Sequence, residues 1–200
     1  MTPARTAADR WWAAAAPVYD RCVGLVGWHA AQESLVADLG GGTVLEVGCG
    51  PAHLAGPLLS RGVGYVGLDR NPAMLVRAAR SVAASGRSGG QVVRGDVRAL
   101  PFAARTFDYV VATGVLGLLD AAERGRALRE ISRVTRGEVR LLEPVRRTGS
   151  PPLLTRSRAL AFLRGRPIEL SDLAEVGLTA EIRGPAVLAG VYSAVYAHRR

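Results

Sequence analysis

The chain has 200 residues, 48% of them hydrophobic, a formal net charge of +9 and only two cysteines, Cys22 and Cys49. This length and apolar content suffice for one domain with its own core, spanning residues 1–200. Two cysteines without metal-ligand spacing exclude a disulfide framework and predict no metal site. The stretch "MTPARTAADRWW" has no apolar core of the length of a signal peptide, and no run approaches the ~18 apolar residues of a membrane span. We therefore expect a cytoplasmic protein.

Arginine supplies all of the positive charge. A positive field favours anionic partners such as nucleic acid or an acidic membrane surface. The arginines are spread along the chain rather than clustered with aromatic residues, so ordinary solvated faces account for them and a nucleic-acid partner is not favoured. Tryptophan and arginine near the start of the chain are compatible with peripheral membrane contact, although core packing explains the tryptophans better.

Residues 4–39 show apolar positions at helical spacing, which Pro17, Gly24 and Gly27 are expected to interrupt. Strand-like and helix-like segments then alternate, which predicts a parallel sheet with helices on both faces. Asn71 and Pro72 mark the start of one helix, and Pro57 predicts that the first helix after residue 48 is short, kinked or late. The expected strands are 43–48, 65–69, 91–96, 107–113 and 138–145, followed by an antiparallel pair at 179–184 and 190–199.

A glycine-rich turn follows the first strand in "VLEVGCGPAH", residues 44–53. Gly48 and Gly50 fit the first two glycines of the dinucleotide fingerprint G-x-G-x-x-G, but the third position is His53. A phosphate on this turn is therefore disfavoured, and a tight turn without a ligand remains open.

Carboxylates lie at or near the ends of three successive strands: Glu46, Asp69 and Asp96. The carboxyl ends of parallel strands form the ligand-binding edge of such a sheet. Asp69 can accept both hydroxyls of a ribose, and Asn71 already fills the alternative role of helix cap. Asp96 can accept an adenine amino group beside the Val97 amide, although alone it is equally a turn residue. Together the three carboxylates favour a cationic, adenosine-containing ligand.

The segments "VLEVGCGPAHLA", "VGLDRNPAML", "RGDVRALPFAARTFDYVVATGVL" and "LREISRVTRGEVRLLEP" resemble, in this order, the motifs of class I S-adenosylmethionine-dependent methyltransferases. The nearest branch acts on small molecules and lipids and includes quinone-biosynthesis and phospholipid N-methyltransferases. The resemblance covers residues 43–145. It implies a Rossmann-like, seven-stranded, mostly parallel sheet with one antiparallel strand near the C-terminus. It also implies S-adenosylmethionine as cofactor and methyl transfer to a small, apolar or lipid-like acceptor by in-line displacement.

Residue by residue, the resemblance implies a cofactor site with four parts. The methionine end lies on the glycine turn, the ribose on Asp69, the adenine near Met74 and Asp96, and the methyl donor beside Thr113. An N-terminal helical lid, residues 1–40, and an acceptor-side cap, residues 146–170, complete it. The implied cofactor residues are Glu46, Gly48, Cys49, Gly50, Asp69, Arg70, Met74, Asp96, Val97, Thr113 and Gly114.

Two positions depart from the family pattern. Ala52 stands where a third glycine is common, and Gly117 where a histidine often follows the fourth strand. The candidates for acceptor-side catalysis are therefore His29, as a base, and Tyr19 on the lid, as a donor or orienting group. His53 is expected to shape the cofactor turn instead.

Three other functions remain open from the residues alone. A nucleic-acid methyltransferase fits the charge but lacks an Asn/Asp-Pro-Pro-aromatic motif and a placed nucleophilic cysteine. A nicotinamide-dependent reductase is opposed by His53 and by the lack of a substrate domain. A binding protein that keeps the cofactor but not the reaction is opposed by the three carboxylates and favoured by the missing histidine.

Overall fold

The computed structural model describes residues 27–146, 166–187 and 192–199. The expected Tyr19, most of the lid and most of the acceptor-side cap lie outside these ranges. The described helices are α2 (Trp28–Leu35), α3 (Ala55–Ser60), α4 (Pro72–Ala84), η1 (Leu116–Leu118, a 3-10 turn), α5 (Ala121–Val134) and α6 (Leu170–Ala174). The strands are β1 (Thr43–Val47), β2 (Gly64–Asp69), β3 (Gly90–Arg94), β4 (Phe107–Thr113), β5 (Thr135–Pro144), β6 (Leu178–Val187) and β7 (Tyr192–Arg199).

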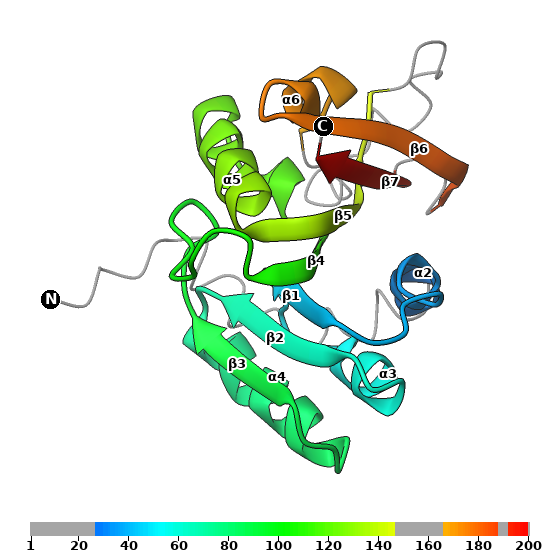
Figure 1. Ribbon diagram of the computed structural model, residues 1–200, viewed down its shortest axis with the longest axis vertical. Coiled ribbons are helices and arrows are strands. Elements are labelled where there is room, and N and C mark those ends of the chain that lie inside the picture. Colours follow the sequence, from blue (N-terminus) through cyan, green and yellow to red (C-terminus); the bar gives the residue numbers. More distant parts are fainter. Residues whose placement is uncertain (1–26, 147–165, 188–191, 200) are drawn as a thin grey trace, which may run out of the picture.

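The seven strands form one sheet in the order β3-β2-β1-β4-β5-β7-β6 (Figure 1). The first five strands pair in parallel, and β7 is inserted antiparallel between β5 and β6. The strand order reverses between β1 and β4, so the carboxyl ends of these two strands border the crevice where ligands bind in open α/β sheets. The predicted parallel sheet and antiparallel closing pair are confirmed.

Helices cover both faces of the sheet. Leu128 and Ile131 of α5 and Leu173 of α6 belong to one buried apolar cluster. Leu35 of α2, together with residues of α3 and α4, belongs to a second cluster against the other face. Figure 1 shows α5 and α6 on the opposite side of the sheet from α2 and α3.

Local signals in the sequence account for several helix ends. The Asn71 side chain accepts a hydrogen bond from the Ala73 amide at 2.9 Å, with Pro72 in the first helical position of α4. Helix α3 begins only at Ala55 and has six residues, as Pro57 predicts. Gly27, with φ +77°, precedes α2 and confirms the interruption expected there.

Several strand boundaries differ from the expected ones, and the largest differences near the pocket are in β3 and β5. Strand β3 ends at Arg94, so Asp96 lies in the following loop. Strand β5 starts at Thr135, directly after α5, rather than at residue 138. Gly137 permits this early start, because a Cβ there would lie 2.5 Å from the Asp108 carbonyl oxygen of the neighbouring strand.

Candidate functional site

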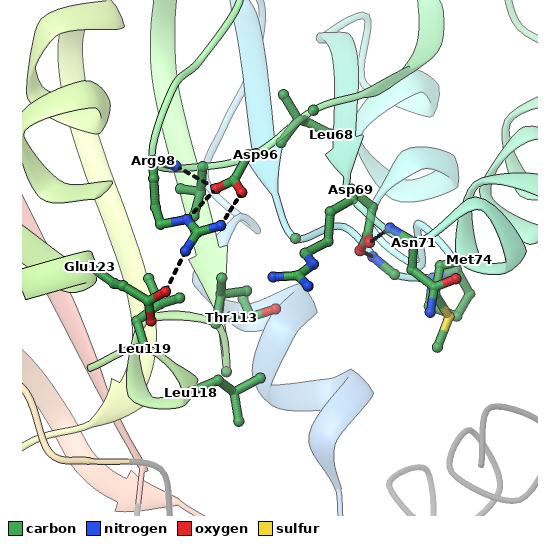
Figure 2. Close-up of a pocket in the computed structure, with 18 residues that line it drawn as sticks. Leu68, Asp69, Asn71, Met74, Asp96, Arg98, Thr113, Leu118, Leu119 and Glu123 are labelled. Carbon is green, nitrogen blue, oxygen red and sulfur yellow. Dashed lines mark hydrogen bonds and ion pairs between the residues drawn. The ribbon is translucent and has the colours of Figure 1, made fainter. Parts of the chain in front are cut away.

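A pocket of about 480 Å³ lies at the carboxyl ends of β1, β2 and β4, next to the loop after β3 (Figure 2). Its size is in the range of sites that hold a cofactor or another small ligand. The residues predicted from the sequence that line it are Gly48, Gly50, Asp69, Arg70, Met74, Asp96, Val97, Thr113 and Gly114. The remaining lining residues are Pro51, Leu68, Asn71, Gly95, Arg98, Val115, Leu118, Leu119 and Glu123.

The glycine turn forms one wall of the pocket. Gly48 and Gly50 have φ of +63° and +52°, a left-handed conformation in which side chains are strained. A Cβ on Gly48 would lie 2.4 Å from Cγ2 of Val115, whereas one on Gly50 would meet nothing within 4 Å. The turn thus leaves open space above Gly50 that a ligand can fill.

Asp69 joins this turn to the start of α4. Its Oδ2 accepts from the Gly50 amide at 2.9 Å, and its Oδ1 accepts from the Asn71 amide at 2.8 Å. The Arg70 amide also contributes a hydrogen bond to this carboxylate. A carboxylate has about four acceptor directions, so Asp69 can still accept from a ribose hydroxyl. Burial raises the pKa of Asp69, and the backbone amides partly offset this rise. Asn71 is the helix cap, as predicted.

An ion-pair chain forms the opposite wall (Figure 2). Oδ1 of Asp96 accepts from the amide and the Nε of Arg98 at 2.9 and 2.8 Å, and its Oδ2 accepts from Nη2 at 2.5 Å. Nη1 of Arg98 bonds Glu123 of α5. The hydrogen bonds from Arg98 lower the pKa of Asp96 and keep it ionised. The sequence predicted Asp96, but neither Arg98 nor Glu123.

Glu46 and Cys49 are predicted site residues that the pocket lining does not include. Glu46 is buried, and its Oε2 accepts a 2.5 Å hydrogen bond from the hydroxyl of Tyr65, also buried. Burial raises the pKa of Glu46 to about 8 and raises that of the Cys49 thiol as well. The expectation that three carboxylates line one edge is corrected accordingly: Asp69 and Asp96 line the pocket, and Glu46 is turned onto Tyr65.

Helix α2 borders the pocket at the end of β4. Nε2 of Gln32 donates to the Thr113 hydroxyl at 2.8 Å, and a Cβ on Gly114 would lie 3.2 Å from the Trp28 ring. His29, the predicted base, is not among the described lining residues. Its ring lies 3.8 Å from that of His53, and its Nε2 is buried without a hydrogen-bond partner.

Glu143, at the end of β5, holds the loop that follows β4. Its fully buried carboxylate accepts from three successive amides, those of residues 115, 116 and 117, at 2.7, 2.9 and 3.1 Å. Burial raises its pKa to about 7 against the opposing effect of these amides. The sequence analysis missed this residue, although its place at a strand end in "LLEP" was a usable signal.

The fold and the pocket define a Rossmann-like α/β domain with a ligand-sized pocket at the switch in strand order. Residues 44–138 match the family model described as "Methyltransferase domain". This segment is therefore similar to methyltransferase domains, a class that uses S-adenosylmethionine as cofactor.

Two relatives illustrate the likeness. A demethylmenaquinone methyltransferase of Thermobifida fusca is 33% identical over 115 residues, which are 58% of this chain and 48% of that protein. An uncharacterized methyltransferase of Mycolicibacterium vanbaalenii is 34% identical over 134 residues, which are 66% of this chain and 48% of that protein. The chain thus spans about half the length of each.

Solved structures share the fold at lower identity. The cyclase SpnF aligns with a TM-score of 0.75 and 17% identity, covering 100% of this chain and 97% of that one. Magnesium protoporphyrin IX methyltransferase from Synechocystis, solved with bound SAH, aligns with a TM-score of 0.65 and 20% identity, covering 88% and 81%. One fold therefore accompanies a cyclase and a methyltransferase, so it does not by itself identify a reaction. Among the helices described, none combines the length and apolarity needed to cross a bilayer.

Proposed function

We propose that the chain transfers the methyl group of S-adenosylmethionine to a small, apolar or lipid-like acceptor. The observation that carries the proposal is the pocket itself, where a left-handed glycine turn faces two carboxylates at the switch point of the sheet. In this assignment the methionine part lies on Gly48 and Gly50, the ribose on Asp69, and the adenine beside Asp96 and Val97. Thr113 and Gly114 border the reacting methyl group.

The acceptor class is supported by the apolar side of the pocket. Leu118 is 53% exposed and lines the pocket together with Leu119 and Val115. An exposed leucine at a pocket wall favours an apolar ligand, because binding removes that surface from water. The similarity to a demethylmenaquinone methyltransferase supports a quinone-type acceptor.

The chemistry requires alignment more than acid–base assistance. Methyl transfer is an in-line displacement at a carbon that the sulfonium already activates, and positioning supplies roughly 7–11 kcal/mol in favourable cases. His29 is the candidate base: its Nε2 lacks a hydrogen-bond partner, and its neighbours Trp28 and Gln32 contact the end of β4. Tyr19 lies outside the described residues, and its role stays a prediction. Glu46 and Cys49 are assigned to pack beneath the glycine turn rather than to line the pocket.

The first test is calorimetric titration with S-adenosylmethionine and, separately, with NADH. We expect micromolar binding of S-adenosylmethionine that is lost in Asp69→Ala. Asp108→Ala is the matched control, because Asp108 also accepts a backbone amide at 2.9 Å, that of Thr43, but does not line the pocket. Binding of NADH in place of S-adenosylmethionine would overturn the proposal.

The acceptor is tested with S-adenosylmethionine that carries a radioactive methyl group. A prenylated naphthoquinol, phosphatidylethanolamine vesicles and duplex DNA serve as acceptors, and extraction separates the products. Label in the organic phase is expected, with slower transfer by His29→Asn at unchanged cofactor affinity. Label in the DNA alone, or cofactor binding without transfer to either apolar acceptor, contradicts the proposed acceptor class.

A further inference from the structure

We propose that Arg98 is a positioning residue that makes the pocket selective for adenine: it holds the Asp96 carboxylate in place, and Glu123 holds Arg98. This inference rests on the placement of adenine beside Asp96 under the proposed function. It concerns a residue that would act through another and does not require contact between Arg98 and the cofactor.

The hydrogen bonds leave Asp96 with a defined remaining acceptor. Oδ1 receives two donors from Arg98, its amide and its Nε, and Oδ2 receives one, Nη2. A carboxylate oxygen accepts about two hydrogen bonds, so only Oδ2 has a direction left. Asp96 lines the pocket, and this direction can therefore serve a ligand. The exocyclic amino group of adenine is a donor and fits it, whereas hypoxanthine presents a carbonyl oxygen there and is repelled.

Glu123 holds the side of the Arg98 guanidinium that does not bond Asp96. Glu123 bonds Nη1 of Arg98 through one oxygen and accepts from the Asp120 amide through the other at 3.2 Å. The Glu123 amide in turn donates to the Asp120 side chain at 2.8 Å, which completes a capping box at the start of α5. Arg98 therefore connects the loop after β3 to the start of helix α5, and one guanidinium holds these two parts of the same pocket wall together (Figure 2).

A second arginine, Arg133 of helix α5, provides a matched control. Arg133 bonds Glu130 at 2.7 and 2.8 Å and donates to the carbonyls of Phe102 and Leu100, so it also ties this loop to α5. The side chains of Arg98 and Arg133 are comparably exposed, at 29% and 36%. Arg133 does not line the pocket. Loss of loop anchoring alone should therefore affect both arginine variants, but loss of Asp96 positioning should affect only Arg98→Ala.

The experiment measures the ratio of affinities for S-adenosylhomocysteine and S-inosylhomocysteine, in which hypoxanthine replaces adenine. Both ligands are uncharged at sulfur, so the sulfonium charge does not enter the comparison. We expect the wild type to prefer adenine by about 100-fold, the order of the contribution of one hydrogen bond to a charged group. Arg98→Ala should lower this ratio about tenfold. Arg98→Lys should recover only part of the ratio, because lysine keeps the positive charge but lacks the planar guanidinium that bonds both oxygens of Asp96.

The controls separate the possible failures. Arg133→Ala should leave the ratio unchanged even if it lowers thermal stability. An unchanged ratio in folded Arg98→Ala, or an equal fall in Arg133→Ala, overturns the inference. Asp96→Ala tests the placement of adenine: if it leaves the ratio at the wild-type value, the proposed adenine site is wrong. If Asp96→Ala lowers the ratio and Arg98→Ala does not, only the role of Arg98 is wrong.

Discussion

The turn after β1 and the loop after β3 form opposite walls of the pocket, and different forces hold them. The turn depends on left-handed glycines, on a carboxylate that accepts backbone amides, and on the buried pair of Glu46 and Tyr65 beneath it. The loop depends on the ion pairs of Arg98, whose side chain is partly exposed. Backbone shape and burial therefore determine the first wall, and side-chain charge determines the second.

The largest effect that would test this contrast is expected at Gly48. Gly48→Ala combines left-handed strain of ~1–2 kcal/mol with overpacking of ~1–3 kcal/mol against Val115, so we expect a loss of roughly 2–5 kcal/mol of stability. Gly50→Ala carries only the strain, of ~1–2 kcal/mol, and should instead weaken cofactor binding, because its Cβ enters the open space of the pocket. Urea unfolding and calorimetry measure the two effects. Equal losses of stability would contradict this account of the turn.

The stability of the folded protein should depend on pH through Glu46, which is buried beneath the glycine turn. The pKa of Glu46 is raised in the folded protein from 4.5 to about 8, so its stabilising contribution is complete below 4.5 and is lost as the pH rises through about 8. Linkage predicts that unfolding free energy falls by about 2–3 kcal/mol between pH 6 and pH 9 because of this group. Denaturant unfolding at a series of pH values measures this fall.

Glu46→Gln isolates this contribution, because glutamine can still accept from Tyr65 but does not titrate. Glu143, with a pKa raised to about 7, titrates in the same window in both proteins. The difference between the two pH profiles therefore reports Glu46 alone. Parallel profiles would mean that Glu46 is not protonated at neutral pH. Asp96, with its pKa lowered by Arg98, should stay ionised throughout.

The smallest effect is expected at Ala52, which is buried with φ +60° where the family often has glycine. Ala52→Gly stabilises the folded protein by ~1–2 kcal/mol, because it relieves the left-handed strain. It destabilises the protein by ~0.8 kcal/mol through the lost burial of a methyl group, and by a further ~0.4–1 kcal/mol because glycine raises the entropy of the unfolded chain. Stability should therefore change by less than about 1 kcal/mol. Ala55→Gly, buried in α3, has no strain to relieve and should lose about 2 kcal/mol. Similar losses in urea unfolding of the two variants would show that Ala52 is unstrained.

The contrast between the glycine turn and the charged loop also explains which parts of the site could be predicted from the sequence. The glycine turn, the Asn71 cap and the short α3 are encoded within a few neighbouring residues, and all three are confirmed. Asp69 and Asp96 were predictable as pocket residues because parallel strands end at one edge of the sheet.

The charged wall and the buried pairs were not predictable in this way. Arg98 and Glu123 are 25 positions apart, and Tyr65 is 19 positions from Glu46. Their pairing depends on how loops and rotamers orient side chains, which periodicity does not reveal. A position at a strand end likewise does not show whether a carboxylate faces the ligand, as for Asp69, or the interior, as for Glu46.

The anchoring of the loop after β4 has a consequence for how its sequence can vary. The hydrogen bonds that Glu143 accepts from the loop come from the amides of residues 115, 116 and 117, and every residue except proline has such an amide. The conformation of this pocket wall is therefore independent of the hydrogen-bonding side chains it carries. Residues that line the pocket, such as Leu118 and Leu119, can be exchanged during divergence or engineering while the path of the backbone is retained. An anchor of this kind lets one scaffold change its acceptor without rebuilding its cofactor site.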